Sequence, residues 1–133
     1  MKLLADKELL DLMERRLKCK IDVQDPNYVM ISGEPYDEFN AKNVMTAFGR
    51  GFDIDDACKL LNEEYFFSTI NLKEIFRNEE KVKRIKGRII GENGKSRLYI
   101  ESVSGAKMCV YGNTVSLIGK IDEIKIADTA IQI

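Results

Sequence analysis

The sequence contains no histidine and no tryptophan, only two prolines, and three cysteines in 133 residues. Cys19, Cys58 and Cys109 are scattered, and no Cys-x-x-Cys pair occurs. Without histidine to complete a ligand set, this pattern argues against a zinc site and against a disulfide framework. Each cysteine has apolar neighbours and is expected to be a small core residue. A reducing, intracellular location fits this composition, and no cofactor is expected.

Long apolar runs and low-complexity segments are also absent. No apolar stretch approaches the ~18 residues that a membrane span requires. The start, MKLLADKELLDL, is charged and is not a secretory signal. Hydrophobic residues make up 44% of the sequence, which is enough for a modest core. The length predicts one domain or two very small ones.

The net charge of −1 hides an asymmetry between two parts of the chain. Residues 1–80 carry 11 basic and 17 acidic residues, whereas residues 81–133 carry 10 basic and 5 acidic ones. Such an imbalance marks either a solvated face or the site of an anionic partner. The segment 81–97 concentrates seven basic residues against the single acid Glu92; they are Lys81, Lys83, Arg84, Lys86, Arg88, Lys95 and Arg97.

Apolar spacing and turn residues predict the elements of the first half. Leu9, Met13 and Leu17 recur every four residues, which indicates an amphipathic helix. Gly49 and Gly51 are expected to end a later helix. The expected order is a helix over 6–17, strands over 19–23 and 27–32 with a turn at 24–27, a helix from 35 to 48, a short helix capped by Asp53, and a strand over 65–71.

Glycines interrupt the pattern of the second half. Ser96, Ile100 and Val103 are expected on the buried face of one helix, and Ile124, Ala127 and Ile131 on that of another. The expected order is a helical or irregular connector over 72–82, a short helix over 85–90, a break at 91–94, a helix over 95–105, strands over 106–111 and 114–119 joined by a tight Gly112–Asn113 turn, and a final helix. The order helix, strand, strand, helix occurs in both halves, which suggests a weak internal duplication.

The segment IIGENGKSRLYIESVSGAKMCVY resembles the KH-domain family, and the match extends from Ile85 to about Ile131. The resemblance implies an α+β, KH-type (βααββα) C-terminal domain over 65–133, with its Gly-x-x-Gly loop at 91–94. It also implies a truncated or degenerate KH-like domain over 1–64, since LLADKE stands where a glycine loop would be.

The residue chemistry of this loop suits a nucleic-acid backbone. Two glycines remove side-chain bulk, so that a sugar–phosphate chain can approach the main chain. Unpaired amides at the start of the following helix favour a phosphate. In KH modules such a loop clamps the backbone of about four nucleotides. The RNA-binding residues expected here are Lys86, Gly87, Arg88, Ile90, Gly91, Glu92, Asn93, Gly94, Lys95 and Arg97.

The bases are expected to turn into an apolar groove beside the loop. Ile89 and Ile90 would form its floor, together with Met108 and Val110 of the following strand. Leu98 and Tyr99 lie off the expected core face, where they either contact RNA or a protein partner or are incidentally exposed. The double substitution of Gly91 and Gly94 by Asp is expected to abolish RNA binding and to leave the fold intact.

The chain is also similar, over nearly its whole length, to the partner-of-Nob family of ribosome-assembly factors. The Gly-Arg-Gly-Phe element at 49–52 and the Tyr-Gly-x-Thr hairpin at 111–114 carry this resemblance. It implies a non-catalytic protein that binds single-stranded small-subunit pre-rRNA near its 3′ end. The implied partners are an rRNA-processing endonuclease and an initiation-factor subunit, and the implied location is cytoplasmic, or nucleolar in a eukaryote. In the 49–52 element, Arg50 either contacts RNA or belongs to a simple helix cap.

Two alternatives to RNA binding are weighed. The run GRIIGENGKS superficially suggests a phosphate-binding P-loop, but the first glycine of that motif would fall on Ile89. No nucleophile–base pair is evident, so catalysis has little support. The remaining alternative is a protein–protein adaptor with a KH fold that does not bind RNA directly. The negative charge of Glu92 in the loop favours this alternative, because it repels phosphate.

Overall fold

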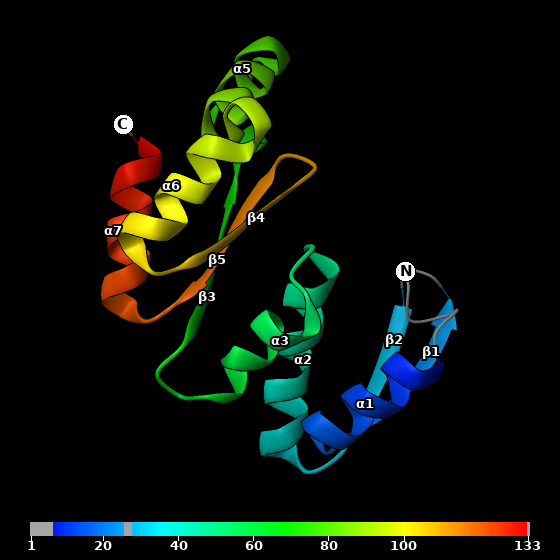
Figure 1. The fold of residues 1–133 in the computed structure, drawn as a ribbon. Helices are drawn as coiled ribbons and strands as arrows, with labels where there is room; N and C mark the ends of the chain where they lie inside the picture. Colours follow the sequence, from blue (N-terminus) through cyan, green and yellow to red (C-terminus); the bar gives the residue numbers. More distant parts are fainter. Residues whose placement is uncertain (1–6, 26–27, 133) are drawn as a thin grey trace.

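Two antiparallel sheets, one in each half of the chain, organise the fold (Figure 1). The computed structural model describes residues 7–25 and 28–132, so the turn expected at 24–27 lies partly outside the described residues. The elements are α1 (Lys7–Leu17), β1 (Lys20–Asp25), β2 (Tyr28–Ser32), α2 (Pro35–Gly49), α3 (Ile54–Ala57), β3 (Phe66–Asn71), α4 (Leu72–Ile75), α5 (Glu79–Ile90), α6 (Lys95–Ser104), β4 (Lys107–Tyr111), β5 (Thr114–Gly119) and α7 (Ile121–Gln132).

The second half has the order strand, helices, strand, strand, helix that the sequence predicts. Its sheet has the strand order β3-β5-β4, so β5 lies in the centre and β4 forms one edge. Tyr111 pairs with Thr114 across the two-residue turn at Gly112–Asn113. The first half contributes a separate two-stranded sheet of β1 and β2.

Both faces of the three-stranded sheet are covered. Because side chains alternate between the faces of a strand, Ile70, Met108 and Leu117 join one hydrophobic cluster with residues of α5, α6 and α7. Phe67 and Ile118 point the other way and join the core of the first half. Figure 1 shows this arrangement, with α6 and α7 on one side of the sheet and α2 and α3 on the other.

An aromatic pair links the two halves. Phe52 is 4% exposed and packs edge-to-face on Phe67, with 6.3 Å between ring centroids. Such pairs contribute roughly 0.5–1.5 kcal/mol beyond the area they bury. Phe52 therefore fixes the loop after α2 against the sheet.

The two halves have matching hydrogen bonds between a helix and the strand after it. The backbone N–H of Ile21 donates to Glu14 Oε2 at 2.8 Å, and that of Met108 donates to Glu101 Oε2 at 2.9 Å; seven residues separate the partners in both cases. In each half the residue after the helix that carries the glutamate has positive φ, Lys18 in the first and Gly105 in the second. The two halves thus share a helix–strand junction as well as an order of elements, and the internal duplication stays a prediction.

Helix α5 is longer than the sequence pattern predicts. It begins at Glu79 and not near residue 85, because the side chain of Asn78 accepts hydrogen bonds from the amides of Glu80 and Lys81. This N-cap stabilises the charged segment as a helix. Most of the cationic cluster therefore stands on one regular helix.

One further expectation is wrong. Val103 is 45% exposed, and Ser104 takes its place in the core because its hydroxyl is satisfied by Ile100 O and the amide of Ala106. The two glycines expected to end α2 do so: Gly49 is its last residue, and the backbone turns at Gly51, whose φ is +106°. Among the described residues, no helix is long and apolar enough to cross a membrane.

Candidate nucleic-acid interface

The corner between α5 and α6 is built from three residues with positive φ. Gly91 and Gly94 both have φ of +75°, and Asn93 between them has φ of 56°. A Cβ on Gly91 would lie 2.6 Å from the backbone N of Ser96, so only glycine fits there. A Cβ on Gly94 would meet no atom within 4 Å. Gly91 thus shapes the corner, while Gly94 leaves open space in front of the main chain.

The corner exposes the first turn of α6. Gly94 occupies the N-cap position, and no side chain caps the helix. The amides of Gly94 and Lys95 donate to the carbonyl groups of Gly91 and Glu92, so an anion at this helix N-terminus would be bound by the amides that follow them. Glu92, Asn93 and Lys95 are exposed at the corner. The main chain of the loop is thus accessible, and a phosphate site at this corner stays a prediction.

A groove of about 250 Å³ runs from this corner along the edge of the sheet. Ile90 and Arg97 form one wall, and Arg50 and Gly51 from the loop after α2 form the opposite wall. The floor is β4, whose consecutive residues Met108, Cys109, Val110 and Tyr111 all line the groove. Consecutive lining residues mean that the groove follows the strand edge, not one face of the sheet.

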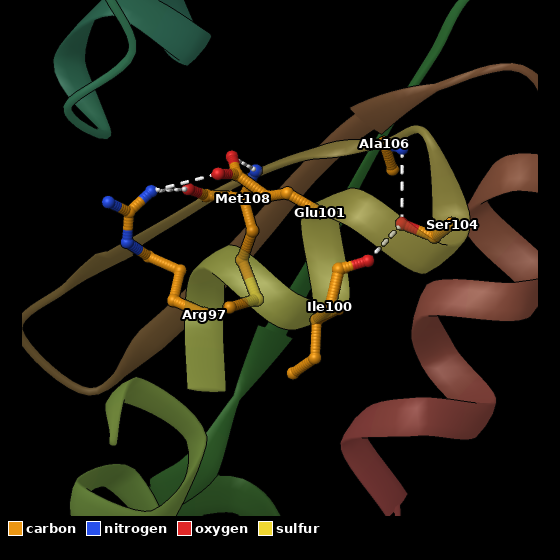
Figure 2. A network of polar contacts seen from close by, with 6 residues as sticks. All are labelled: Arg97, Ile100, Glu101, Ser104, Ala106 and Met108. Atoms are coloured by element: carbon orange, nitrogen blue, oxygen red, sulfur yellow. Dashed lines mark hydrogen bonds and ion pairs between the residues drawn. The ribbon is translucent and has the colours of Figure 1, made fainter. Parts of the chain in front are cut away.

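A polar clamp holds α6 against the edge of β4. Figure 2 shows Glu101 accepting from the backbone N–H of Met108, while Arg97 donates to Met108 O at 3.4 Å. Arg97 and Glu101 also pair with each other at 3.2 Å. Both main-chain groups of Met108 at the edge are thus occupied. Because outward-facing groups alternate along an edge strand, Val110 is the next residue to present its N–H and C=O to the groove.

The structure brings together most of the predicted RNA-binding residues. Ile90 and Arg97 line the groove. Gly91, Glu92, Asn93, Gly94 and Lys95 follow Ile90 directly and form the corner between α5 and α6, outside the lining of the groove. Lys86 lies one helical turn before Ile90 on the same side of α5. Gly87 is exposed, with open space in front of it.

Two predicted residues lie elsewhere. Ile89 is 5% exposed and belongs to the core, because the inward side of α5 carries Val82 and Ile89. Arg88 is exposed and lies about 160° around α5 from Ile90, given about 100° per helical residue. Of the two isoleucines expected in the groove floor, only Ile90 lines it.

Some groove residues were not predicted. Cys109 and Tyr111 were overlooked because strict alternation assigns them to the other face of the strand, whereas a groove along an edge exposes both. Arg50 was an open alternative, and it both follows the end of α2 and lines the groove. No sequence signal indicates that the loop after α2 reaches this strand.

The groove interior is weakly polar. Burial raises the pKa of the Cys109 thiol, although the neighbouring Arg97 guanidinium acts in the opposite direction. The thiol therefore stays neutral near pH 7. Within the described part of the chain, no three His, Cys, Asp or Glu residues are grouped to hold a metal ion. The groove offers apolar contact and main-chain hydrogen bonds.

A family model matches the second half of the chain, and curated relatives match more of it. The family model named for the second KH domain of PNO1, described as a eukaryotic-type KH domain (KH-domain type I), matches residues 66–133. The chain is 36% identical over 125 residues to KH domain-containing protein MJ0443 of Methanocaldococcus jannaschii, covering 90% of this chain and 55% of that protein. It is 31% identical to the pre-rRNA-processing protein pno1 of Aspergillus fumigatus, covering 68% and 37%. The chain spans about half, or less, of the length of these curated relatives.

Solved structures resemble almost the whole chain. Dim2p from Pyrococcus horikoshii OT3 superposes with a TM-score of 0.85 at 37% identity, covering 99% of this chain and 82% of that one. A crystal structure of an a/eIF2alpha–aDim2p–rRNA complex from the same organism gives the same TM-score and identity, covering 99% and 76%.

Proposed function

We propose, since this chain belongs to the type I KH-domain family of PNO1 and Dim2p, that it is a non-catalytic factor that binds single-stranded small-subunit pre-rRNA near its 3′ end. Residues 65–133 act as the RNA-binding KH domain in this proposal. Residues 1–64 act as a degenerate KH-like domain without a glycine loop of its own, and they supply one wall of the groove through Arg50.

One juxtaposition carries the proposal. An open glycine corner adjoins a groove that has Ile90 in one wall, an arginine in each wall and the edge strand β4 as its floor. A single RNA strand has the same two sides, with charged phosphates along one and flat bases along the other. A phosphate seated near Gly94 would direct the attached base toward Ile90 and Val110.

The free main-chain groups of Val110 suit base recognition. An unpaired N–H and C=O two atoms apart on an edge strand present one donor and one acceptor to an incoming base. Met108 cannot do this, because Arg97 and Glu101 already occupy its groups. Because of this clamp, main-chain hydrogen bonds from β4 to a base are expected only near Val110.

The partners follow from the relatives. The solved complex of aDim2p contains a/eIF2alpha and rRNA. We extend both to this chain as proposed partners, and we add an rRNA-processing endonuclease because relatives are named for pre-rRNA processing. A cytoplasmic location, or a nucleolar one in a eukaryote, belongs to the same proposal.

A single-stranded oligonucleotide with the 3′-end sequence of small-subunit rRNA tests the proposal. Fluorescence anisotropy at about 50 mM and 200 mM salt should show affinity that falls steeply with salt, since phosphate contacts release counterions. Asn93→Asp keeps the size of the side chain and tolerates positive φ, yet it adds a negative charge at the corner. It should weaken binding several-fold.

Asn62→Asp is the matched control. Asn62 is exposed in a turn that is distant in sequence from the glycine corner. Its Oδ1 atom accepts a hydrogen bond from the amide of Glu64, and aspartate retains this bond. It makes the same change of charge and should leave affinity unchanged. The adaptor alternative holds instead if the wild-type chain shows no salt-dependent RNA binding but still captures a/eIF2alpha.

A further inference from the structure

Helix α5 carries cations on two separate sides. Val82 and Ile89 mark its buried side. Lys83 and Lys86 lie toward Ile90 and the groove. Lys81, Arg84 and Arg88, here called the outer stripe, lie between about 120° and 180° around the helix from Ile90, at about 100° per residue. All three outer residues are exposed.

The outer stripe is not paired in salt bridges. No carboxylate oxygen of the described residues lies within ion-pair distance of Lys81, Arg84 or Arg88, although Glu80 precedes Arg84 by one helical turn. Lys81 lies over the ring of Phe76, 5.2 Å from its centroid. In the first half, by contrast, Arg16 pairs with Asp55 and Lys59 with Asp56. Repulsion between like charges on one helix face destabilises the helix by a few tenths of a kcal/mol per pair. A bound anionic ligand would relieve this repulsion.

The width of α5 separates this stripe from an RNA strand that lies in the groove. An α-helix with its side chains is about 10–12 Å across, and the stripe stands on the far side of α5 from the groove wall. Lys83 and Lys86 are placed to attract the strand in the groove. The outer stripe therefore needs phosphates from a different segment of nucleic acid.

We propose that the outer stripe of α5 binds the phosphate backbone of an RNA duplex adjoining the single strand held in the groove. Binding of single strands usually combines cations with aromatic surfaces on which bases stack. The aromatic ring that contacts the outer stripe, Phe76, is half-buried under Lys81 and is not open for a base to stack on. Double-stranded RNA is recognised mostly through its shape and phosphates, which a straight row of cations on a rigid helix can contact.

The inference rests on the proposed function and deepens it, because it defines the substrate as a junction between duplex and single strand. The test compares two RNAs with the same single-stranded sequence. One is the free oligonucleotide, and the other carries that sequence as a tail on a stable hairpin. The wild-type chain should bind the tailed hairpin more tightly.

The triple variant Lys81→Gln, Arg84→Gln and Arg88→Gln should lose affinity for the tailed hairpin but not for the free oligonucleotide. Affinity for the tailed hairpin should fall about tenfold to hundredfold near physiological salt, and the salt slope should fall by about two to three. Affinity for the free oligonucleotide should change less than about twofold. The double variant Arg84→Gln and Arg88→Gln leaves the Lys81–Phe76 contact intact, and it should show the same selectivity if the triple variant unfolds.

The control triple is Arg15→Gln, Lys20→Gln and Lys125→Gln, which removes the same charge from exposed positions elsewhere. Equal loss in the control and the outer-stripe variant would overturn the inference, as would equal loss for both RNAs or no loss for either. Failure of Asn93→Asp to weaken the free oligonucleotide would overturn the proposed function instead, so the two failures are distinguishable.

Discussion

Glu101 and Met108 are joined by a hydrogen bond of 2.9 Å, in which the backbone N–H of Met108 donates to the carboxylate. The side chain of Glu101 is only 17% exposed and also pairs with Arg97. This one carboxylate therefore satisfies an edge-strand amide and holds the groove wall in place. A matching bond joins the backbone N–H of Ile21 to Glu14 in the first half of the chain.

Glu101→Ala should lower both stability and RNA affinity. Loss of the carboxylate leaves the Met108 amide without its partner, which costs about 1–3 kcal/mol, and it frees Arg97 to move. Urea unfolding and anisotropy with the 3′-end oligonucleotide measure the two effects. Glu14→Ala removes the same bond away from the groove, so it should lower stability but leave affinity unchanged. Equal loss of affinity in both variants would show that the effect is general destabilisation.

Substitution of Gly91 should mainly lower stability, whereas substitution of Gly94 by aspartate should mainly lower RNA affinity. Gly91→Ala places a Cβ 2.6 Å from the Ser96 amide nitrogen and should destabilise the fold strongly. Gly94→Asp meets open space and should carry only the strain of its positive φ, on the order of 1 kcal/mol, while its charge repels phosphate. The structure therefore contradicts the expectation that the double Asp variant would stay folded.

Thermal unfolding and RNA titration of the two single variants check this contrast. Gly94→Ala serves as the control for Gly94→Asp, since it has the same backbone strain without the charge. A Gly91→Ala protein as stable as wild type would mean that the corner can rearrange.

Arg50→Ala should weaken binding of the single-stranded oligonucleotide by about two- to fivefold and lower the salt slope by about 0.7, the value for one phosphate contact on a single strand. Stability should hold, because the hydrogen bonds of Arg50 to α2 come from its backbone N–H, which alanine keeps. Arg15→Ala, on an exposed part of α1, provides the comparison. An unchanged salt slope would show that Arg50 does not contact a phosphate of the RNA.

Asp128→Asn should stabilise the protein at neutral pH. Burial raises the pKa of Asp128, and its Oδ1 atom is enclosed without a hydrogen-bond partner. A carboxyl group whose pKa is raised by folding favours the folded state below its unfolded pKa of about 3.9, and this contribution is lost as the pH rises through the folded pKa. Urea midpoints at about pH 7 should therefore be higher for the variant. The difference should disappear below about pH 4, and a constant difference would point to a change in packing.

The sequence predicted the second half well because its signals are local. The glycine corner, the Gly112–Asn113 hairpin and the end of α6 at Gly105 depend on backbone conformations that few residues adopt. Helix α5 was shortened in the prediction because its N-cap, Asn78, lies within a charged segment without apolar periodicity. Val103 was misplaced because periodicity alone does not show that a serine with two internal hydrogen bonds can replace it in the core.

The groove was predicted only in part, because one of its walls is not local. Ile90 and the glycine corner are near each other in the chain, so their proximity follows from the motif. Arg50 lies beside β4 in a loop that Phe52 anchors on Phe67, and no periodic pattern encodes that contact. The clamp of Arg97 and Glu101 on Met108 likewise becomes apparent only when the strand edge is seen.

The docking of the first half on the β3-β5-β4 sheet has a practical consequence for dissecting the molecule. A fragment cut to residues 66–133, the range of the family match, would carry Phe67 and Ile118 into water on one continuous surface. Such a fragment should self-associate or precipitate on expression, even though its own helices and strands are all present.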